Sequence, residues 1–263
     1  MIATINGINL AYTDQGRGTP VVLLHAFPQN RAMWAPQVDA LSKTHRIIAP
    51  DLRGFGESDA PLWHYTLDQF ADDVAGLLDH LAIRQAVFVG LSMGGYTLFA
   101  FYRKYAARMK GLVLADTRAQ PDTQEGRAGR FVMAQTAYAK GTSAVADIML
   151  PKLLSPGTLQ TKPELVLQVR AAIERTQISG IAGALMAMAE RPDSVPLLAQ
   201  IACPALVITG ELDGPTPPAD GKLMAGAIPS ARLEIISKAG HLSNLEQPEL
   251  FNEALRSFLD RLT

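Results

Sequence analysis

The sequence has a single cysteine, almost no net charge and no long apolar run. Because Cys203 is alone, an internal disulfide framework and a zinc site built from several cysteines are both excluded. The formal net charge of -1 argues against a nucleic-acid binder, so no nucleic-acid partner is expected. Apolar runs such as 21–24 and 205–209 are far shorter than the about 20 residues that span a bilayer, so no membrane partner is expected.

Residues 1–6 contain neither the basic stretch nor the apolar core of a signal peptide, which favours a cytoplasmic location. The chain has 263 residues, of which 48% are hydrophobic and 19% charged, as in ordinary globular proteins. At this length, one large α/β domain with an insertion is as plausible as two small domains. The sequence indicates no oligomeric state.

Short apolar runs alternate with longer amphipathic stretches along most of the chain. Thr66 and Gln69 form a capping-box pattern ahead of one such stretch, and Pro248 suits the first turn of the last. Strands that alternate with helices imply crossover connections and a mostly parallel sheet. We therefore expect an α/β fold with a mostly parallel eight-stranded sheet flanked by helices, its strands at Ile2–Ile5, Ile8–Tyr12, Val21–Leu24, Arg46–Ala49, Val87–Leu91, Leu112–Ala115, Ala205–Thr209 and Leu233–Ile236.

The alternation stops between residues 117 and 195, where the sequence is helical in character. A helical insertion between two strands is the simplest explanation, and it would lie over the carboxyl ends of the strands, where open α/β sheets bind ligands. We expect residues 1–117 and 196–263 to form the core and residues 118–195 a helical cap. The expected cap helices, punctuated by prolines, are Arg130–Ala139, Ser143–Met149, Glu164–Arg175 and Ile181–Ala189.

The strongest chemical signal is a Gly-x-Ser-x-Gly pattern at residues 90–94. It follows the apolar run at 87–89 and precedes a helix-like stretch at 96–105, which is the strand–turn–helix context that this pattern requires. Ser92 would occupy a very tight turn, where side chains two residues away would collide, and Gly90 and Gly94 have none. The pattern therefore predicts that Ser92 is a nucleophile and not an incidental serine of a glycine-rich turn.

A serine nucleophile needs a base within hydrogen-bond reach. His241 follows the last expected strand, so its loop would open at the same sheet edge as Ser92. The other histidines are less suited: His45 and His80 stand at ordinary strand or helix ends, and His64 lies in a loop. We predict His241 as the general base.

The base needs a carboxylate that fixes its tautomer and stabilises its charged form. Asp213 comes shortly after the strand 205–209, and the order Ser, Asp, His along the chain is the one expected for this type of turn. Asp116 is a real competitor, because its loop opens at the same edge. Glu211 and Glu246 are weaker competitors. The predicted triad is thus completed by Asp213.

Acyl transfer also needs donors for the oxyanion. One N–H should come from Met93, directly after the nucleophile, and the second from Phe27 in the loop after strand 21–24. Pro28 has no N–H and stiffens that turn. His25 begins the same loop and has two possible roles: a structural residue, which we favour, or a contact to substrate.

These motifs resemble the α/β-hydrolase superfamily, and the resemblance covers nearly the whole chain. Residues 25–28 (HAFP) resemble its His-Gly-x-Pro loop, with Ala26 in place of the usual glycine, and residues 51–58 resemble its Asp-x-Arg-Gly-x-Gly-x-Ser segment, whose role is mainly structural. Residues 90–94, 210–213 and 240–246 match the nucleophile, acid and base loops. Within the superfamily, the chain is most similar to small serine carboxylesterases and the 3-oxoadipate enol-lactonase-like group.

The resemblance implies a serine hydrolase that cleaves small to medium apolar carboxylic esters through an acyl-enzyme. Haloalkane dehalogenases and epoxide hydrolases of this fold carry an aspartate where this chain has Ser92, so both are disfavoured. No metal and no organic cofactor is expected, and the partner is a small-molecule ester or lactone. Lactone hydrolysis, carbon–carbon bond hydrolysis, perhydrolysis and a non-enzymatic ligand receptor on the same fold remain open alternatives.

Apolar residues of the insertion could line a substrate pocket. They could equally pack the cap onto the sheet, and the sequence does not separate the two. Our candidates for substrate binding are Leu150, Leu153 and Met186, together with His25 and Leu242 of the core. Arg118, Arg127 and Arg130 could bind a substrate carboxylate, although solvated surface arginines are the preferred interpretation.

Overall fold

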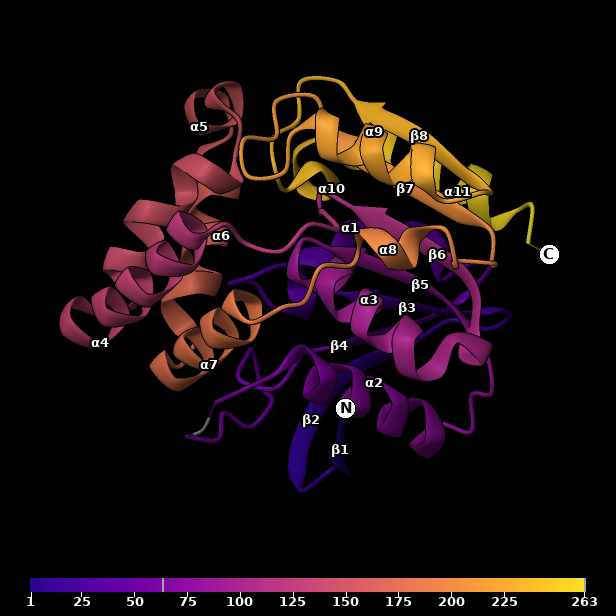
Figure 1. Cartoon of the computed structure of the whole chain (residues 1–263), viewed down its shortest axis with the longest axis horizontal. Coiled ribbons are helices and arrows are strands. Elements are labelled where there is room, and N and C mark those ends of the chain that lie inside the picture. Colours follow the sequence, from indigo (N-terminus) through magenta and orange to yellow (C-terminus); the bar gives the residue numbers. More distant parts are fainter. Residues whose placement is uncertain (63, 263) are drawn as a thin grey trace.

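The computed structural model describes residues 1–62 and 64–262. Its centre is one eight-stranded sheet with the strand order β1-β2-β4-β3-β5-β6-β7-β8 (Figure 1). Strand β2 pairs antiparallel with both of its neighbours, β1 and β4, and the remaining neighbouring strands pair parallel. The strands are β1 (Ile2–Ile5), β2 (Ile8–Gln15), β3 (Pro20–Leu24), β4 (Arg46–Pro50), β5 (Ala86–Leu91), β6 (Met109–Ala115), β7 (Ala205–Gly210) and β8 (Ala231–Ile236). The predicted mostly parallel, eight-stranded sheet is confirmed.

The order of the strands reverses at β3, which lies between β4 and β5. After β3, the chain forms β4 on one side of β3 and then crosses over to form β5 on the other side. In open α/β sheets the crevice at such a reversal, at the carboxyl ends of the strands, is where ligands bind. The loops after β3 and β5 are those that carry Phe27 and Ser92.

Helices cover both faces of the sheet. In Figure 1, α2, α3 and α9 lie on one face, and α1 and α11 lie on the other, where they contact each other. The predicted capping box begins α2: Gln69 N–H donates to Thr66 Oγ1 (3.1 Å), and Thr66 N–H donates to Gln69 Oε1 (3.0 Å). The core helices are η1 (Arg31–Trp34), α1 (Ala35–Leu41), α2 (Leu67–His80), α3 (Met93–Tyr105), η2 (Ala106–Arg108), α8 (Val195–Leu198), α9 (Pro218–Ala227), α10 (Ser243–Glu246) and α11 (Pro248–Leu259). Among the described residues, none of the helices has the length and apolar character needed to cross a membrane.

Four helices between β6 and β7 form a separate layer beyond the carboxyl ends of the strands, at the left of Figure 1. We call them the cap: α4 (Gln124–Leu153), α5 (Pro156–Thr161), α6 (Pro163–Arg175) and α7 (Ile178–Ala189). Helix α4 consists of two helical segments that meet at Gly141, whose φ of 79° and ψ of 178° are not helical and suit only glycine. This break lies between the helices predicted at 130–139 and 143–149, so the prediction of two helices there is confirmed. Pro151 lies in the last turn of α4 and does not separate elements. The short α5 was not predicted.

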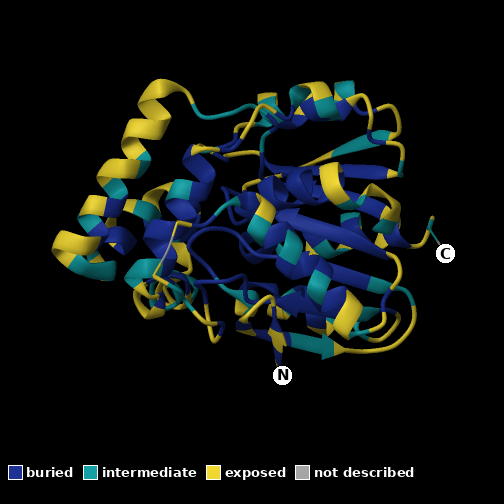
Figure 2. Ribbon diagram, turned by 60° about the horizontal axis from the view of Figure 1, so that its bottom comes forward, coloured by how far each residue is buried: buried dark blue, intermediate teal, exposed yellow. Residues whose placement is uncertain are grey.

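Two glycines of α7 allow the cap to pack closely against the core. A Cβ on Gly180 would lie 1.8 Å from the carbonyl oxygen of Gly54, and one on Gly183 would lie 2.6 Å from the ring of Tyr65. Backbone therefore touches backbone where α7 meets the loop after β4. Figure 2 shows the consequence: the inner turns of the cap are buried, and its exposed residues are on the outer helices.

A buried ion pair connects the loop after β4 to α2. Arg53 Nε and one terminal nitrogen lie 2.6 and 2.7 Å from the carboxylate oxygens of Asp73. Asn6 Nδ2 donates to the same carboxylate at 3.1 Å. The side chain of Asp73 is only 1% exposed, so removal of the arginine would leave a buried charge without its counter-ion.

We expect Arg53→Ala to lower the free energy of unfolding by about 3 kcal/mol, the low end for a broken buried pair, because Asn6 still donates to Asp73. Asp147→Asn is the control: it breaks an exposed pair with Arg170 and should cost less than about 1 kcal/mol. Urea denaturation measures both. Equal losses of unfolding free energy in the two variants would show that the buried Arg53–Asp73 pair stabilises the fold no more than the exposed pair does.

Candidate active site

Ser92 stands between the end of β5 and the first turn of α3, in a strained conformation. Its φ of 54° and ψ of -110° lie outside the regions that serine ordinarily adopts. The turn is possible because both flanking glycines lack a side chain. A Cβ on Gly90 would lie 2.5 Å from the carbonyl carbon of Gly94, and one on Gly94 would lie 2.2 Å from the oxygen of Leu24. Ser92 Oγ consequently projects from the end of the sheet.

His241 lies on the loop after β8 and faces Ser92. Its Nε2 is 2.9 Å from Ser92 Oγ, and its Nδ1 is 3.0 Å from both carboxylate oxygens of Asp213, which lies in the loop after β7. All three side chains are largely buried. The structure thus brings the three predicted triad residues into one hydrogen-bonded chain, across sequence separations of 149 and 28 residues.

Thr216 holds the carboxylate of Asp213 in place and was not among the residues predicted from the sequence. Its hydroxyl donates to one oxygen (2.6 Å) and its N–H to the other (2.9 Å). Burial raises the pKa of Asp213, but the charge of His241 and the hydrogen bonds from His241 and Thr216 outweigh it and leave the pKa lowered. The Asp-x-x-Thr spacing, in which an aspartate accepts from the backbone of its own turn, is the signal that could have found this residue.

Asp116, the competing acid, is close by but does not face His241. Its Oδ1 accepts the N–H of Gly210 at 2.7 Å, and its Oδ2 accepts the hydroxyl of Ser243. Burial, together with the nearby charge of Asp213, raises the pKa of Asp116 well above its ordinary value. Asp116 therefore connects the end of β7 to the segment after β8, whereas the carboxylate that bonds the imidazole is that of Asp213.

The proposed oxyanion donors, Phe27 and Met93, follow β3 and β5, which are adjacent in the sheet. Within residues 1–62 and 64–262, neither of their N–H groups has a hydrogen-bond partner in the protein. Both residues are almost completely buried. Free N–H groups at the start of α3 and in the neighbouring loop suit an oxyanion site, and this role stays a prediction.

His25 holds the oxyanion loop and does not offer an atom to substrate. Its Nδ1 lies 2.9 Å from the carbonyl oxygen of Ala26, and its Nε2 accepts the N–H of Leu52 at 3.0 Å. The ring is fully buried against Phe55, and burial lowers its pKa. Both ring nitrogens are thus occupied by the backbone. The prediction that His25 contacts substrate is corrected to the structural role, the alternative favoured by its position in the sequence.

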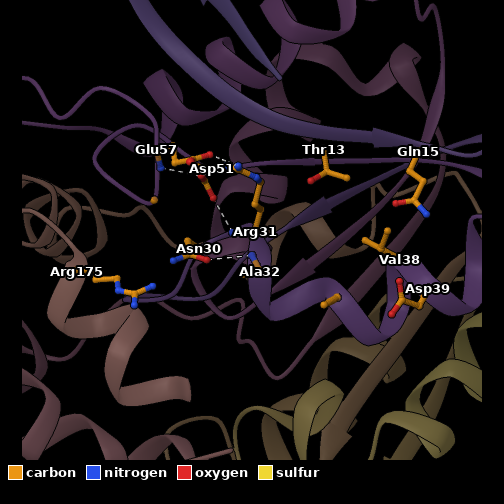
Figure 3. Close-up of a pocket in the computed structure, with 12 residues that line it drawn as sticks. Thr13, Gln15, Asn30, Arg31, Ala32, Val38, Asp39, Asp51, Glu57 and Arg175 are labelled. Atoms are coloured by element: carbon orange, nitrogen blue, oxygen red, sulfur yellow. Dashed lines mark hydrogen bonds and ion pairs between the residues drawn. The ribbon is translucent and has the colours of Figure 1, made fainter. Parts of the chain in front are cut away.

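A second set of contacts, centred on Asp51, supports the loop of His25 and Phe27 from outside. The buried carboxylate of Asp51 accepts the N–H groups of Arg31 (2.7 Å) and Glu57 (2.9 Å), and the guanidinium of Arg31 pairs with both acids (Figure 3). A pocket of about 630 Å³ lies beside these residues, and Arg175 of α6 borders it from the cap. None of the triad residues lines this pocket, so it is distinct from the candidate active site.

Three of the predicted substrate-binding residues meet where the cap reaches the base loop. Leu150 and Leu153 are buried at the end of α4, and Leu242, directly after His241, donates its N–H to the oxygen of Leu153 at 3.0 Å. Their contact with substrate stays a prediction. Met186 instead lines a separate surface pocket of about 320 Å³ whose lining includes no triad residue, which does not support its predicted role.

The cap arginines are bound to other groups of the protein. Arg118 lies 3.3 Å from Asp220, Arg130 pairs with Asp122, and Arg127 donates to the carbonyl oxygen of Ala189 at 2.8 Å. Arg118 and Arg130 are therefore paired with carboxylates of the protein, while Arg127 is exposed, as preferred from the sequence.

Comparisons with known proteins agree with this architecture. Residues 19–248 match the family model for the alpha/beta hydrolase fold. The chain belongs to the α/β hydrolase family. This confirms the resemblance that the sequence motifs indicated.

Its relatives include esterases and lactonases. The chain is similar in structure to a thermophilic esterase from Thermogutta terrifontis, with 42% identity, a TM-score of 0.96 and coverage of 100% of this chain and 98% of the other. An enol-lactonase from Burkholderia xenovorans matches with 35% identity and a TM-score of 0.93 over 99% of this chain and 100% of its own. In sequence, 3-oxoadipate enol-lactonase 2 of Acinetobacter baylyi is 32% identical over 254 residues, 97% of this chain and 93% of that protein.

The two aspartates at the site give a direct test of which one supports His241. We expect Asp213→Asn to lower kcat for an ester by about 10⁴-fold, because the imidazole loses the carboxylate that fixes its tautomer. Asp116→Asn should change kcat by less than about tenfold, since it alters hydrogen bonds to Gly210 and Ser243 only. Steady-state kinetics on both variants measures this, and the opposite ranking would assign the acid to Asp116.

Proposed function

We propose that the protein is a carboxylic-ester hydrolase that works through a covalent acyl-enzyme on Ser92. The observation that carries this proposal is the distance of 2.9 Å between Ser92 Oγ and His241 Nε2, with Asp213 bonded to the opposite nitrogen of the same ring. A serine in such a chain can lose its proton to the imidazole as it attacks a carbonyl carbon.

In the first half of the reaction, Ser92 Oγ forms a bond to the ester carbonyl carbon while His241 Nε2 takes the serine proton. The carbonyl oxygen becomes an oxyanion that the N–H groups of Phe27 and Met93 can bind. The lowered pKa of Asp213 keeps its carboxylate ionised beside the imidazolium. His241 then gives its proton to the alkoxide as the ester C–O bond breaks, which releases the alcohol and leaves Ser92 acylated.

In the second half, water replaces the alcohol and the steps run in the same order. His241 takes a proton from water as the water oxygen attacks the acyl carbon. The bond between this carbon and Ser92 Oγ then breaks, and His241 returns the proton to Oγ as the acid leaves. Every proton moves through His241. The residues of this chain therefore account for the reaction from ester and water to acid and alcohol.

Lactone hydrolysis is the second candidate, and it is supported by the enol-lactonases among the relatives. A lactone of 3-oxoadipate carries a free carboxylate, which a cationic side chain would have to bind. The cap arginines considered for that task are held by Asp220, Asp122 and the carbonyl of Ala189. We therefore favour neutral esters as substrates.

The nucleophile is tested with a panel of p-nitrophenyl esters and lactones. We expect Ser92→Ala to fold normally and to lose turnover by at least about 10³-fold, because no other group can form the acyl-enzyme. A fluorophosphonate probe should label the wild type at Ser92 and leave the variant unlabelled. Unchanged turnover in the variant would refute the hydrolase mechanism, and a folded wild type that does not react with the probe would favour a ligand receptor.

Substrate charge is tested with a matched pair of esters. We expect p-nitrophenyl butyrate to have a kcat/KM about 10- to 100-fold higher than p-nitrophenyl hemisuccinate, since the second ester would bring an unpaired carboxylate into the site. Comparable values for the two esters would mean that a cationic side chain reaches the substrate, and would favour the lactonase.

A further inference from the structure

Glu246 lies five residues after His241, at the end of α10, and its side chain is completely buried. Its Oε1 accepts the N–H of Gly240 at 2.8 Å, in the loop that carries His241. Its Oε2 accepts the N–H of Ser155 at 2.9 Å, in the cap between α4 and α5. One carboxylate thus joins the cap to the residue that precedes the base. We call this pair of contacts the Glu246 bridge.

The residue on the other side of His241 is also tied to the cap. Leu242 N–H donates to the oxygen of Leu153 at 3.0 Å. Lys162, the residue before α6, donates from Nζ to the carbonyl oxygen of Glu246 at 2.7 Å. Both neighbours of His241 in the sequence are therefore fixed, directly or through Glu246, to the same short stretch of the cap.

The loop that carries His241 is closely packed on both sides. A Cβ on Gly240 would lie 2.7 Å from the nitrogen of Ser155 and 3.1 Å from the carbonyl carbon of Leu154. On the opposite side, a Cβ on Gly210 would lie 2.1 Å from the oxygen of Gly240. The loop is held between the end of β7 and the cap.

We propose that Glu246 is a positioning residue, which sets the place of the His241 imidazole by fixing its loop to the cap at Ser155. The inference rests on the proposed function, since it concerns the base of that reaction. Glu246 does not touch the reacting atoms. It acts through the backbone of Gly240, and a displacement of about 1 Å between reacting groups can cost about 10²-fold in rate.

The test is Glu246→Gln, with Glu249→Gln as the matched control at an exposed position of α11. The amide of glutamine can accept one of the two N–H groups, but its own NH₂ opposes the other. We expect kcat for p-nitrophenyl acetate to fall about 10- to 100-fold, with KM changed by less than about threefold. The control should keep the wild-type values. A folded Glu246→Gln protein with wild-type kcat would overturn the proposal, as would a loss confined to KM.

Hydrogen exchange measured by mass spectrometry separates this proposal from the proposed function. In Glu246→Gln, peptides covering 153–158 and 239–247 should both exchange faster, while the sheet strands stay protected. If the wild type lacks Ser92-dependent turnover, the proposed function fails, and this measurement still decides whether the bridge exists. Faster exchange in only one of the two segments would overturn the bridge.

Should the variant fail to fold, the wild type itself provides the test by amide-resolved NMR exchange. The amides of Gly240 and Ser155 donate to the same carboxylate, so both should be strongly protected with matched protection factors. A Ser155 amide that exchanges freely while Gly240 stays protected would overturn the proposal.

Discussion

The strained backbone of Ser92 is the constraint on which the rest of the site depends. A serine at φ 54° costs roughly 1–3 kcal/mol, and such a residue persists only where its surroundings leave no alternative. Here the N–H of Ser92 donates to Ala115 at the end of β6, and its carbonyl oxygen accepts the hydroxyl of Thr117. Together with the space left by Gly90 and Gly94, these bonds hold the turn in a shape that places Oγ beside His241.

The loops around Ser92 are connected to one another by buried polar groups. Asp116 joins the root of the acid loop at Gly210 to Ser243 of the base loop, and Thr216 fixes the acid itself. Each buried acceptor has donors from two different segments. Because an unpaired buried donor or acceptor is costly, these bonds allow few arrangements of the loops, and the site is organised before any substrate arrives.

The sequence alone predicted the sheet and the loops that bring Ser92, Asp213 and His241 together, because the strands and the loops that follow them have local sequence signals. Alternating apolar runs give the strands, and Gly-x-Ser-x-Gly between a strand and a helix gives the turn at Ser92. It also predicted separate helices at 130–139 and 143–149, and Gly141 interrupts the helical backbone of α4 between them. It did not single out Thr216, although the Asp-x-x-Thr spacing is local, and it gave no indication that Glu246 bonds Ser155, which lies 91 residues away. The predicted substrate contacts of His25 and Met186 are not supported, because the burial and direction of a side chain do not follow from local sequence spacing; the structural role of His25 was the alternative favoured from the sequence.

The contact between Gly180 of α7 and Gly54 has a consequence for engineering the protein. With no side chain between the two backbones, the separation of the layers at this point is already at its minimum. A cap transplanted from a relative would need an equally small residue at the equivalent of Gly180, whatever the rest of its sequence. Chimeras that exchange the cap to alter selectivity should therefore be screened first at this single position, before any residue near the serine is redesigned.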